Sequence, residues 1–106
     1  MTPGGNTRAS LSEPGGTKHD EGKPDLSILP YSALRELAHV MSYGAAKYGR
    51  DNYKKGFVPH RLIAAALRHL YSYNEGEELD ESGYSHLAHA IANCAMLLEL
   101  EKENKQ

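Results

Sequence analysis

Apolar residues recur at steps of three and four in three separate segments of this chain, and this period restricts the fold more than any other feature. The segments run from after Pro30 to Gly49, from about 60 to 73, and from 82–85 to about 101. No segment alternates apolar and polar residues as a half-buried strand does. The sequence therefore predicts an all-α fold, a small bundle of about three main helices.

Local signals refine these helices. Ser32 is expected to cap the first helix and Gly49 to end it. The apolar stripe of the first helix comprises Leu34, Leu37, Ala38, Met41 and Ala45. The apolar set of the third comprises Leu87, Ala88, Ile91, Cys94, Ala95 and Leu98. Because Cys94 is the only cysteine, an intramolecular disulfide framework is excluded, and we expect a buried, unreactive thiol.

Residues 1–18 differ in composition from the rest of the chain. Residues 1–18 contain two Pro-Gly-Gly triplets and almost nothing to bury, so we expect a flexible leader there. Residues 19–106 are expected to form a single helical domain, in keeping with a length of 106 residues. Three helices of this size bury a modest core, which favours a homo-oligomer.

Charge and hydropathy exclude two classes of partner. Lys and Arg number 12 against 14 Asp and Glu, a formal net charge of −2, which disfavours binding to duplex nucleic acid. No apolar stretch approaches the roughly 20 residues that span a bilayer, and no apolar signal core follows Met1. We therefore expect a cytoplasmic protein without a membrane partner.

Polar residues share one face of the first expected helix. Glu36, His39, Tyr43 and Lys47 follow one another at offsets of three, four and four. A carboxylate, an imidazole, a phenol and an ammonium on one face suit a wall that binds metal and phosphate. A solvated face with ordinary ion pairs explains the same pattern.

Histidines and arginines mark the other two helices. His86, His89 and Asn93 share an edge of the third helix, either for metal binding or as structural histidines bonded to a neighbouring helix. Arg68 and His69 lie on the second helix, where a guanidinium suits phosphate, although salt bridges to the acidic loop are an alternative.

Two loops carry concentrated charge. Residues 75–81 hold five carboxylates, the ligand type that Mg²⁺ prefers, although such a run is often only solvated. Residues 44–56 mix four cations with Tyr48 and Tyr53, a combination that suits phosphate contact and stacking on a base. This second loop lacks the Gly and Lys spacing of a Walker loop.

Four blocks of the chain, in order, resemble the largely phage-encoded family described as the N-terminal domain of dATP/dGTP diphosphohydrolase. These blocks are KHDEGKPDLSILP, GAAKYGRDNYKKG, RLIAAALRHL and GEELDESGYSHLAHAIAN. The family is similar to the MazG-like all-α nucleotide pyrophosphohydrolases, which use Mg²⁺ or Mn²⁺. The resemblance implies a purine nucleotide ligand and, for a phage protein, the host cytoplasm.

On this resemblance we expect hydrolysis of dATP or dGTP to a nucleoside monophosphate and pyrophosphate. The expected metal ligands, for Mg²⁺ or Mn²⁺, are Glu36, Glu77 and Asp80. The expected catalytic bases are His69 or His86. The expected contacts to nucleotide and phosphate are Lys23, Lys47, Tyr48, Asn52, Arg68, His89 and Asn93.

A different class of function explains the same residues. The Glu-Glu-x-x-Glu helix motif of the wider pyrophosphohydrolase group is not plainly present in this chain. The alternative is a phage protein without chemistry that sequesters a nucleotide signal, such as a cyclic dinucleotide, and so blocks host defence. A purely structural helical module would explain the apolar stripes but not the charged loops.

Overall fold

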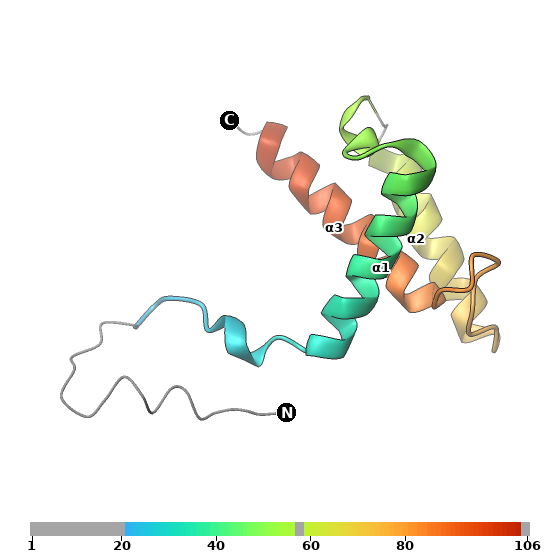
Figure 1. Cartoon of the computed structure of the whole chain (residues 1–106), viewed down its shortest axis with the longest axis horizontal. Coiled ribbons are helices and arrows are strands. Elements are labelled where there is room, and N and C mark those ends of the chain that lie inside the picture. The colour runs from blue at the N-terminus through green and yellow to red at the C-terminus, as the bar shows by residue number, and fades with distance from the viewer. Residues whose placement is uncertain (1–20, 57–58, 105–106) are drawn as a thin grey trace.

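The structure of the chain, a computed structural model, describes residues 21–56 and 59–104. Its elements are η2 (Leu26–Ile28), α1 (Tyr31–Tyr48), η3 (Asn52–Lys54), α2 (Pro59–Asn74) and α3 (His86–Asn104) (Figure 1). Within the described ranges there is no strand, only one isolated bridge between Leu79 and Ser85. The predicted all-α fold with three main helices is confirmed. The expected leader at 1–18 lies outside the described residues.

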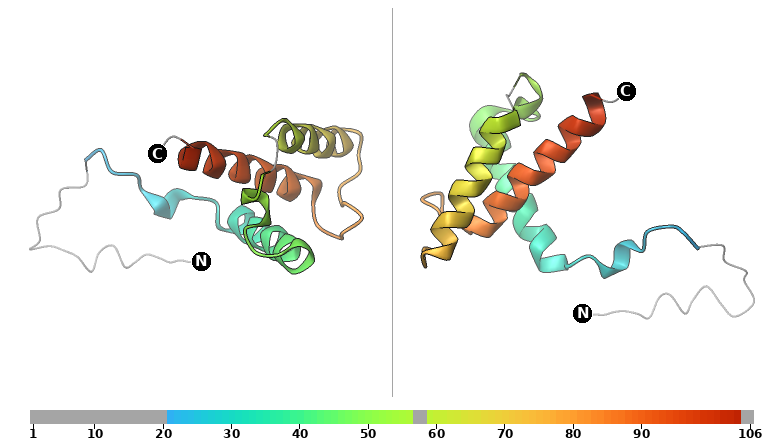
Figure 2. Two further views of the ribbon diagram at one scale, coloured as in Figure 1. Left: turned by 90° about the horizontal axis from the view of Figure 1, so that it is seen from above. Right: turned by 180° about the vertical axis from the view of Figure 1, so that it is seen from behind.

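Helix α3 is the central element. It packs most extensively against α2 and also against α1. In Figure 2, α2 and α3 lie side by side while α1 lies on one side of that pair. The core between α1 and α3 is built on Val40, Ala88 and Ala92, with Leu37, Met41, Tyr84 and Met96 around them. Because alanines supply much of this core, the helices approach closely but bury little apolar area.

The ends of α1 show one correct and one wrong prediction. Gly49 ends the helix with φ 100°, a value that suits glycine, and its N–H donates to the Ala45 carbonyl at 2.8 Å. Ser32 does not cap the other end, because α1 begins at Tyr31 and Pro30 occupies the N-cap position. The N-cap is thus two residues earlier than predicted, and Pro30 occupies it with an extended backbone, φ −71° and ψ 109°.

The predicted apolar set of α3 is largely wrong about burial. Ala88 is buried, but Leu87, Ile91, Cys94 and Leu98 are exposed. The reason is that α1 and α2 cover other sides of α3, where small residues and two polar side chains are buried. Cys94 therefore has an exposed thiol, contrary to the expectation.

The stripe predicted for α1 is displaced in the same way. Val40, which was not in the predicted stripe, is the buried residue of this helix, whereas Leu34 and Ala38 are exposed. Residues 21–30, which include η2, are exposed throughout and lead away from the three helices (Figure 1). In the part of the chain that the structure describes, no helix is both long and apolar enough to cross a membrane.

Candidate functional site

A cavity of about 910 Å³ lies between α1 and α2, with α3 along its wall. The second half of α1, residues 49–53 and the acidic loop before α3 complete the lining. Seven of the predicted catalytic, metal-binding and nucleotide-binding residues line it: Lys47, Tyr48, Asn52, His69, Asp80, His89 and Asn93. The tertiary structure thus gathers residues from four separate segments around one space.

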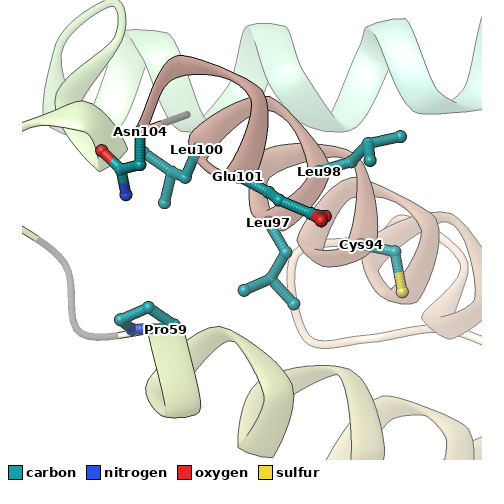
Figure 3. A pocket seen from close by; sticks show the side chains of 7 residues that line it. All are labelled: Pro59, Cys94, Leu97, Leu98, Leu100, Glu101 and Asn104. Carbon is teal, nitrogen blue, oxygen red and sulfur yellow. The ribbon is translucent and has the colours of Figure 1, made fainter. Parts of the chain in front are cut away.

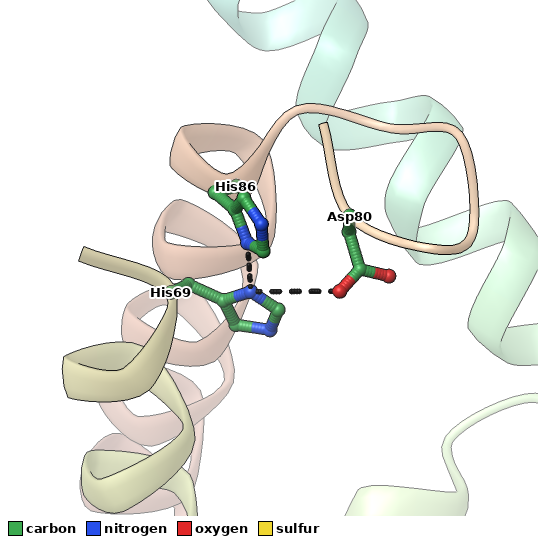
Figure 4. Close-up of side chains that lie close together, drawn as sticks. All are labelled: His69, Asp80 and His86. Carbon is green, nitrogen blue, oxygen red and sulfur yellow. Dashed lines mark hydrogen bonds and ion pairs between the residues drawn. The ribbon is translucent and has the colours of Figure 1, made fainter. Parts of the chain in front are cut away.

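Three histidines meet beside this cavity, one from α2 and two from α3. The Nδ1 atoms of His69 and His86 are 2.8 Å apart, a hydrogen bond in which one nitrogen donates and the other accepts (Figure 4). The rings of His69 and His89 stack with their centroids 4.6 Å apart and an interplanar angle of 13°. Spacing of three on α3 puts His86 and His89 on the same side of that helix, where His69 from α2 reaches both.

Asp80 closes the cluster from the loop between α2 and α3. Its Oδ1 lies 3.9 Å from His69 Nδ1, and its Oδ2 lies 3.5 Å from His89 Nε2. The loop fixes this carboxylate, because the backbone N–H of Ser82 donates to Oδ2 at 2.9 Å. Partial burial alone would raise the pKa of Asp80, but the hydrogen bonds from Ser82 and the nearby histidines lower it below its ordinary value.

A tight turn positions Asp80. The N–H of Asp80 donates to the carbonyl of Tyr84, and the N–H of Gly83 donates to the carbonyl of Asp80, both at 2.8 Å. Gly83 adopts φ 90°, which a residue with a side chain rarely takes. The Ser82-Gly83 pair therefore bends the chain back so that the Asp80 side chain faces α2 and α3.

His69 and His89 are held as neutral rings. Desolvation lowers the pKa of His69, and neighbouring His89 lowers it further against the opposing effect of Asp80. Desolvation also lowers the pKa of His89, although Asp80 counteracts it. His89 Nε2 is 2.8 Å from the Ser82 hydroxyl oxygen. A neutral imidazole has a lone pair that can accept a proton or bind a metal ion.

His86 is the most enclosed member of the cluster. It is 5% exposed, and its Nε2 has no hydrogen-bond partner among the described residues. The nearest acidic oxygen is Oε1 of Glu77 at 3.6 Å, on a side chain that is largely exposed to solvent. Burying a ring nitrogen without a hydrogen-bond partner costs free energy of folding. The position of His86 therefore calls for an explanation other than stability.

The part of the cavity lining that α1 supplies is cationic and aromatic. Lys47 Nζ lies 5.7 Å from the ring centroid of Tyr43 and 5.2 Å from that of Tyr48. A hydrogen bond to Tyr48 and the charges of both phenols raise the pKa of Lys47 above its ordinary value. The ammonium is therefore charged at neutral pH and lies beside two rings that can stack on a base.

Comparison with known proteins places the chain in a family. Residues 13–106 match the family described as dATP/dGTP diphosphohydrolase, N-terminal. The chain belongs to this family. A protein of Salmonella phage PMBT28 named dATP/dGTP diphosphohydrolase is 35% identical over 86 residues, which are 80% of this chain and 29% of that relative. The chain thus spans less than a third of the relative, and no solved structure matches it significantly.

The family match covers the cavity and the whole histidine cluster, but several predicted site residues of this family member lie elsewhere. Glu36 and Arg68 are exposed on α1 and α2 and do not line the cavity. Lys23 lies in the exposed segment before α1. Glu77 is next to His86 but outside the cavity lining.

The three carboxylates predicted as metal ligands do not form one group. Among residues 21–56 and 59–104, the set of His, Cys, Asp and Glu that is close enough to hold an ion is His69, Asp80 and His86. The sequence predicts Asp80 as a metal ligand, offers metal binding as one role of His86, and predicts His69 or His86 as the base. The spacing of His86 and His89 was a usable signal, whereas the meeting with α2 depends on the helix packing.

Proposed function

We propose that this family member binds a purine deoxynucleoside triphosphate in the cavity and hydrolyses it to the monophosphate and pyrophosphate. The observation that carries the proposal is that one cavity is lined both by a cation with aromatic rings and by members of a histidine–aspartate cluster. Its volume of about 910 Å³ suits a nucleotide. The name of the phage relative supports the substrate class.

Each wall has a role in this proposal. The Lys47 ammonium would neutralise phosphate charge, and the Tyr48 ring would stack on the purine. The side-chain amides of Asn52 and Asn93 would hydrogen-bond the nucleotide, although Asn93 also donates to the His89 carbonyl at 3.0 Å. Tyr48 is 60% exposed, so its ring is accessible to a base that enters from solvent.

The reaction needs a water molecule to attack the α-phosphorus while the bond to the bridging α–β oxygen breaks. His69 is the better placed of the two predicted bases, because it lines the cavity whereas His86 is buried behind it. A neutral His69 ring would take the proton from water, and the pyrophosphate leaves with the electron pair of the broken bond.

A divalent ion would supply neutralisation of the phosphate charge in this chemistry. The predicted set of Glu36, Glu77 and Asp80 does not fit a single Mg²⁺ ion, since only Asp80 lines the cavity. We therefore assign no step to that carboxylate set. Of the predicted set, Asp80 lines the cavity, together with Asp51 and Glu81, which were not in that set.

The proposed function includes a second copy of the chain. Exposed apolar side chains form stripes on both α2 and α3, namely Ile63, Leu67 and Leu70, and Leu87, Ile91 and Leu98. These stripes lie away from the α1–α3 core. A groove of about 360 Å³ between Pro59 and the second half of α3 adjoins them, with Cys94 and Leu98 in its lining (Figure 3). Pairing two such faces would bury the apolar area that the small core leaves exposed.

The test is incubation of the purified protein with separate dNTPs, NTPs and cyclic dinucleotides, with and without Mg²⁺ or Mn²⁺. Mass spectrometry then identifies the soluble products and any ligand released on denaturation. We expect a deoxynucleoside monophosphate and pyrophosphate from dATP or dGTP. Recovery of an intact nucleotide only after denaturation would overturn hydrolysis and establish sequestration instead.

A further inference from the structure

We propose that His69, His86 and Asp80 form a site for a first-row transition-metal ion such as Zn²⁺, with one nitrogen from each imidazole and one carboxylate oxygen as ligands. The three ligand atoms come from α2, α3 and the intervening loop and lie within 4.8 Å of one another (Figure 4). The site is distinct from the three-carboxylate set that the sequence predicted. Metal binding at this site requires no nucleotide. It uses the same His69 ring as the proposed hydrolysis, so the base role of His69 belongs to the metal-free chain.

The geometry is close to that of a bound ion. Zn²⁺ binds imidazole nitrogen and carboxylate oxygen at about 2.1 Å, so neighbouring ligand atoms are roughly 3–3.5 Å apart in its tetrahedral sites. The Nδ1 atoms of His69 and His86 are 2.8 Å apart, slightly too close, and His69 Nδ1 is 3.9 Å from Asp80 Oδ1, slightly too far. The ligand atoms of His86 and Asp80 are within 4.8 Å of each other. Side-chain rotations that separate the two rings and draw Asp80 inward would bring all three pairs to the spacing of a bound ion.

The Nδ1 atoms of His69 and His86 face each other, and a single proton lies between them in their hydrogen bond. A hydrogen bond between two neutral imidazoles needs one N–H and one lone pair. A metal ion between them would replace that proton and use both lone pairs, and both rings would then carry their proton on Nε2. The metal therefore substitutes for a contact that the protein makes without it.

The unpartnered nitrogen of His86 is the second, independent observation. His86 Nε2 is buried and has no hydrogen-bond partner within residues 21–56 and 59–104, and Glu77 Oε1 is 3.6 Å away. Histidines that bind metal usually donate the other ring N–H to a carboxylate, which fixes the ring and its tautomer. Metal on Nδ1 would place the proton on Nε2, and a small movement of the Glu77 side chain would bring it within hydrogen-bond distance.

His89 and Ser82 position the ligating carboxylate. Asp80 Oδ2 is 3.5 Å from His89 Nε2 and accepts the Ser82 N–H at 2.9 Å. These contacts hold Oδ2, so that Oδ1 is directed at His69. We therefore assign His89 as a positioning residue, and not as one of the three ligands.

The donor set selects among metals. Two nitrogens and one oxygen suit Zn²⁺, Co²⁺ or Ni²⁺, whereas Mg²⁺ and Ca²⁺ prefer oxygen throughout. Because His69 and Asp80 also line the cavity, the remaining coordination position would face it. Three protein ligands with one open position are typical of zinc sites that bind a water molecule or a substrate.

The experiment titrates the chelator-treated full chain with Co²⁺ alone and follows the visible absorption bands of the bound ion, which report its coordination. Elemental analysis gives the stoichiometry, and displacement by Zn²⁺ is followed by the loss of the bands. We expect one ion per chain and no displacement by excess Mg²⁺. Absence of stoichiometric Co²⁺ binding by a folded chain would overturn the proposal.

Variants identify the ligands. We expect H69Q and D80N each to weaken Co²⁺ binding by at least about ten-fold, the size of effect seen for groups that orient or ligate metal. H60Q is the matched control, since His60 is an exposed histidine on the same helix as His69. Equal weakening in H60Q, or unchanged binding in both H69Q and D80N, would contradict the site.

A further variant tests whether weakened Co²⁺ binding could result from misfolding. E77Q changes a largely exposed side chain, so the fold should not depend on it. We expect E77Q to weaken Co²⁺ binding several-fold with an unchanged circular-dichroism spectrum. Failure of dNTP hydrolysis in the wild type, with Co²⁺ binding intact, would refute the proposed function and leave the metal site standing.

Discussion

His69 and His86 share a hydrogen bond of 2.8 Å between their Nδ1 atoms, although they are 17 positions apart in the chain. This contact joins the last part of α2 to the first residue of α3 and brackets the loop that carries Asp80. The geometry of the cluster thus depends on how the two helices pack, and any change in that packing moves all of its members together.

Asp80 is the residue whose loss should affect catalysis most selectively. We expect D80N to lower kcat/KM for dATP or dGTP by at least about ten-fold, because an amide cannot supply the carboxylate charge beside His69. The measurement is initial-rate kinetics together with a thermal melt to confirm folding. E75Q removes a carboxylate from the same loop outside the cavity and should leave the rate unchanged. An unchanged rate in D80N would show that the Asp80 carboxylate does not contribute to the reaction.

Lys47 should act in binding. We expect K47A to raise KM for the triphosphate by roughly ten-fold, the effect of losing one charged hydrogen bond, with a smaller change in kcat. K55A is the control, because Lys55 is also exposed and lies close in sequence but does not line the cavity. If both variants raised KM equally, general surface charge rather than the cavity wall would explain the binding.

The stability of the metal-free chain should fall as the pH decreases from about 7 to 5. Burial lowers the pKa of His69 and His89 from the ordinary 6.5. As the pH falls, the unfolded chain therefore binds protons at these two rings before the folded chain does, and this stabilises the unfolded state. A difference of one bound proton between the unfolded and folded chains changes the free energy of unfolding by about 1.4 kcal/mol per pH unit. The partial exposure of both rings reduces this effect.

Urea unfolding at several pH values in the presence of a chelator measures this slope. H89Q should flatten the pH dependence, since it removes one of the two titrating rings. Stability that rises as the pH falls across this interval would contradict the arrangement of neutral histidines.

The helices of this fold could be predicted from the sequence because the signals that start and end them are local. Gly49 ends α1 as predicted, and Pro59 begins α2 one residue before the expected start. Which side of each helix is buried was harder to predict from the sequence. Two neighbours cover α3 on different sides, so its long apolar residues are not its buried ones, and the Cys94 prediction failed for this reason.

The candidate site was predictable as a set of residues but not as a geometry. Spacing of three identifies His86 and His89 as neighbours on one helix edge. Nothing local indicates that His69 meets them, because that contact depends on how α2 packs against α3. Likewise, five carboxylates in one loop look equivalent in the sequence, and only the turn at Ser82 and Gly83 selects Asp80.

The segment that follows α1 should be held by an ion pair. Lys54 of η3 lies 2.8 Å from Glu103 at the end of α3, and this contact lowers the pKa of Glu103. We expect E103Q to speed amide exchange of residues 50–56 several-fold, and high salt to have the same effect on the wild type. Lowering the pH through the pKa of Glu103 should also loosen the segment, since the charge is lost. Unchanged exchange in E103Q would show that other contacts hold it.

Ile91 should be central to the pairing of two copies. It is 40% exposed in the middle of the α3 stripe, between Leu87 and Leu98. If the wild type pairs as proposed, we expect I91E to be a monomer in light scattering, because a buried carboxylate without a partner opposes association. L34E is the matched control, since Leu34 is 42% exposed but lies on α1, away from this face. Dissociation by L34E but not by I91E would move the interface to α1, and a monomeric wild type would exclude the pairing altogether.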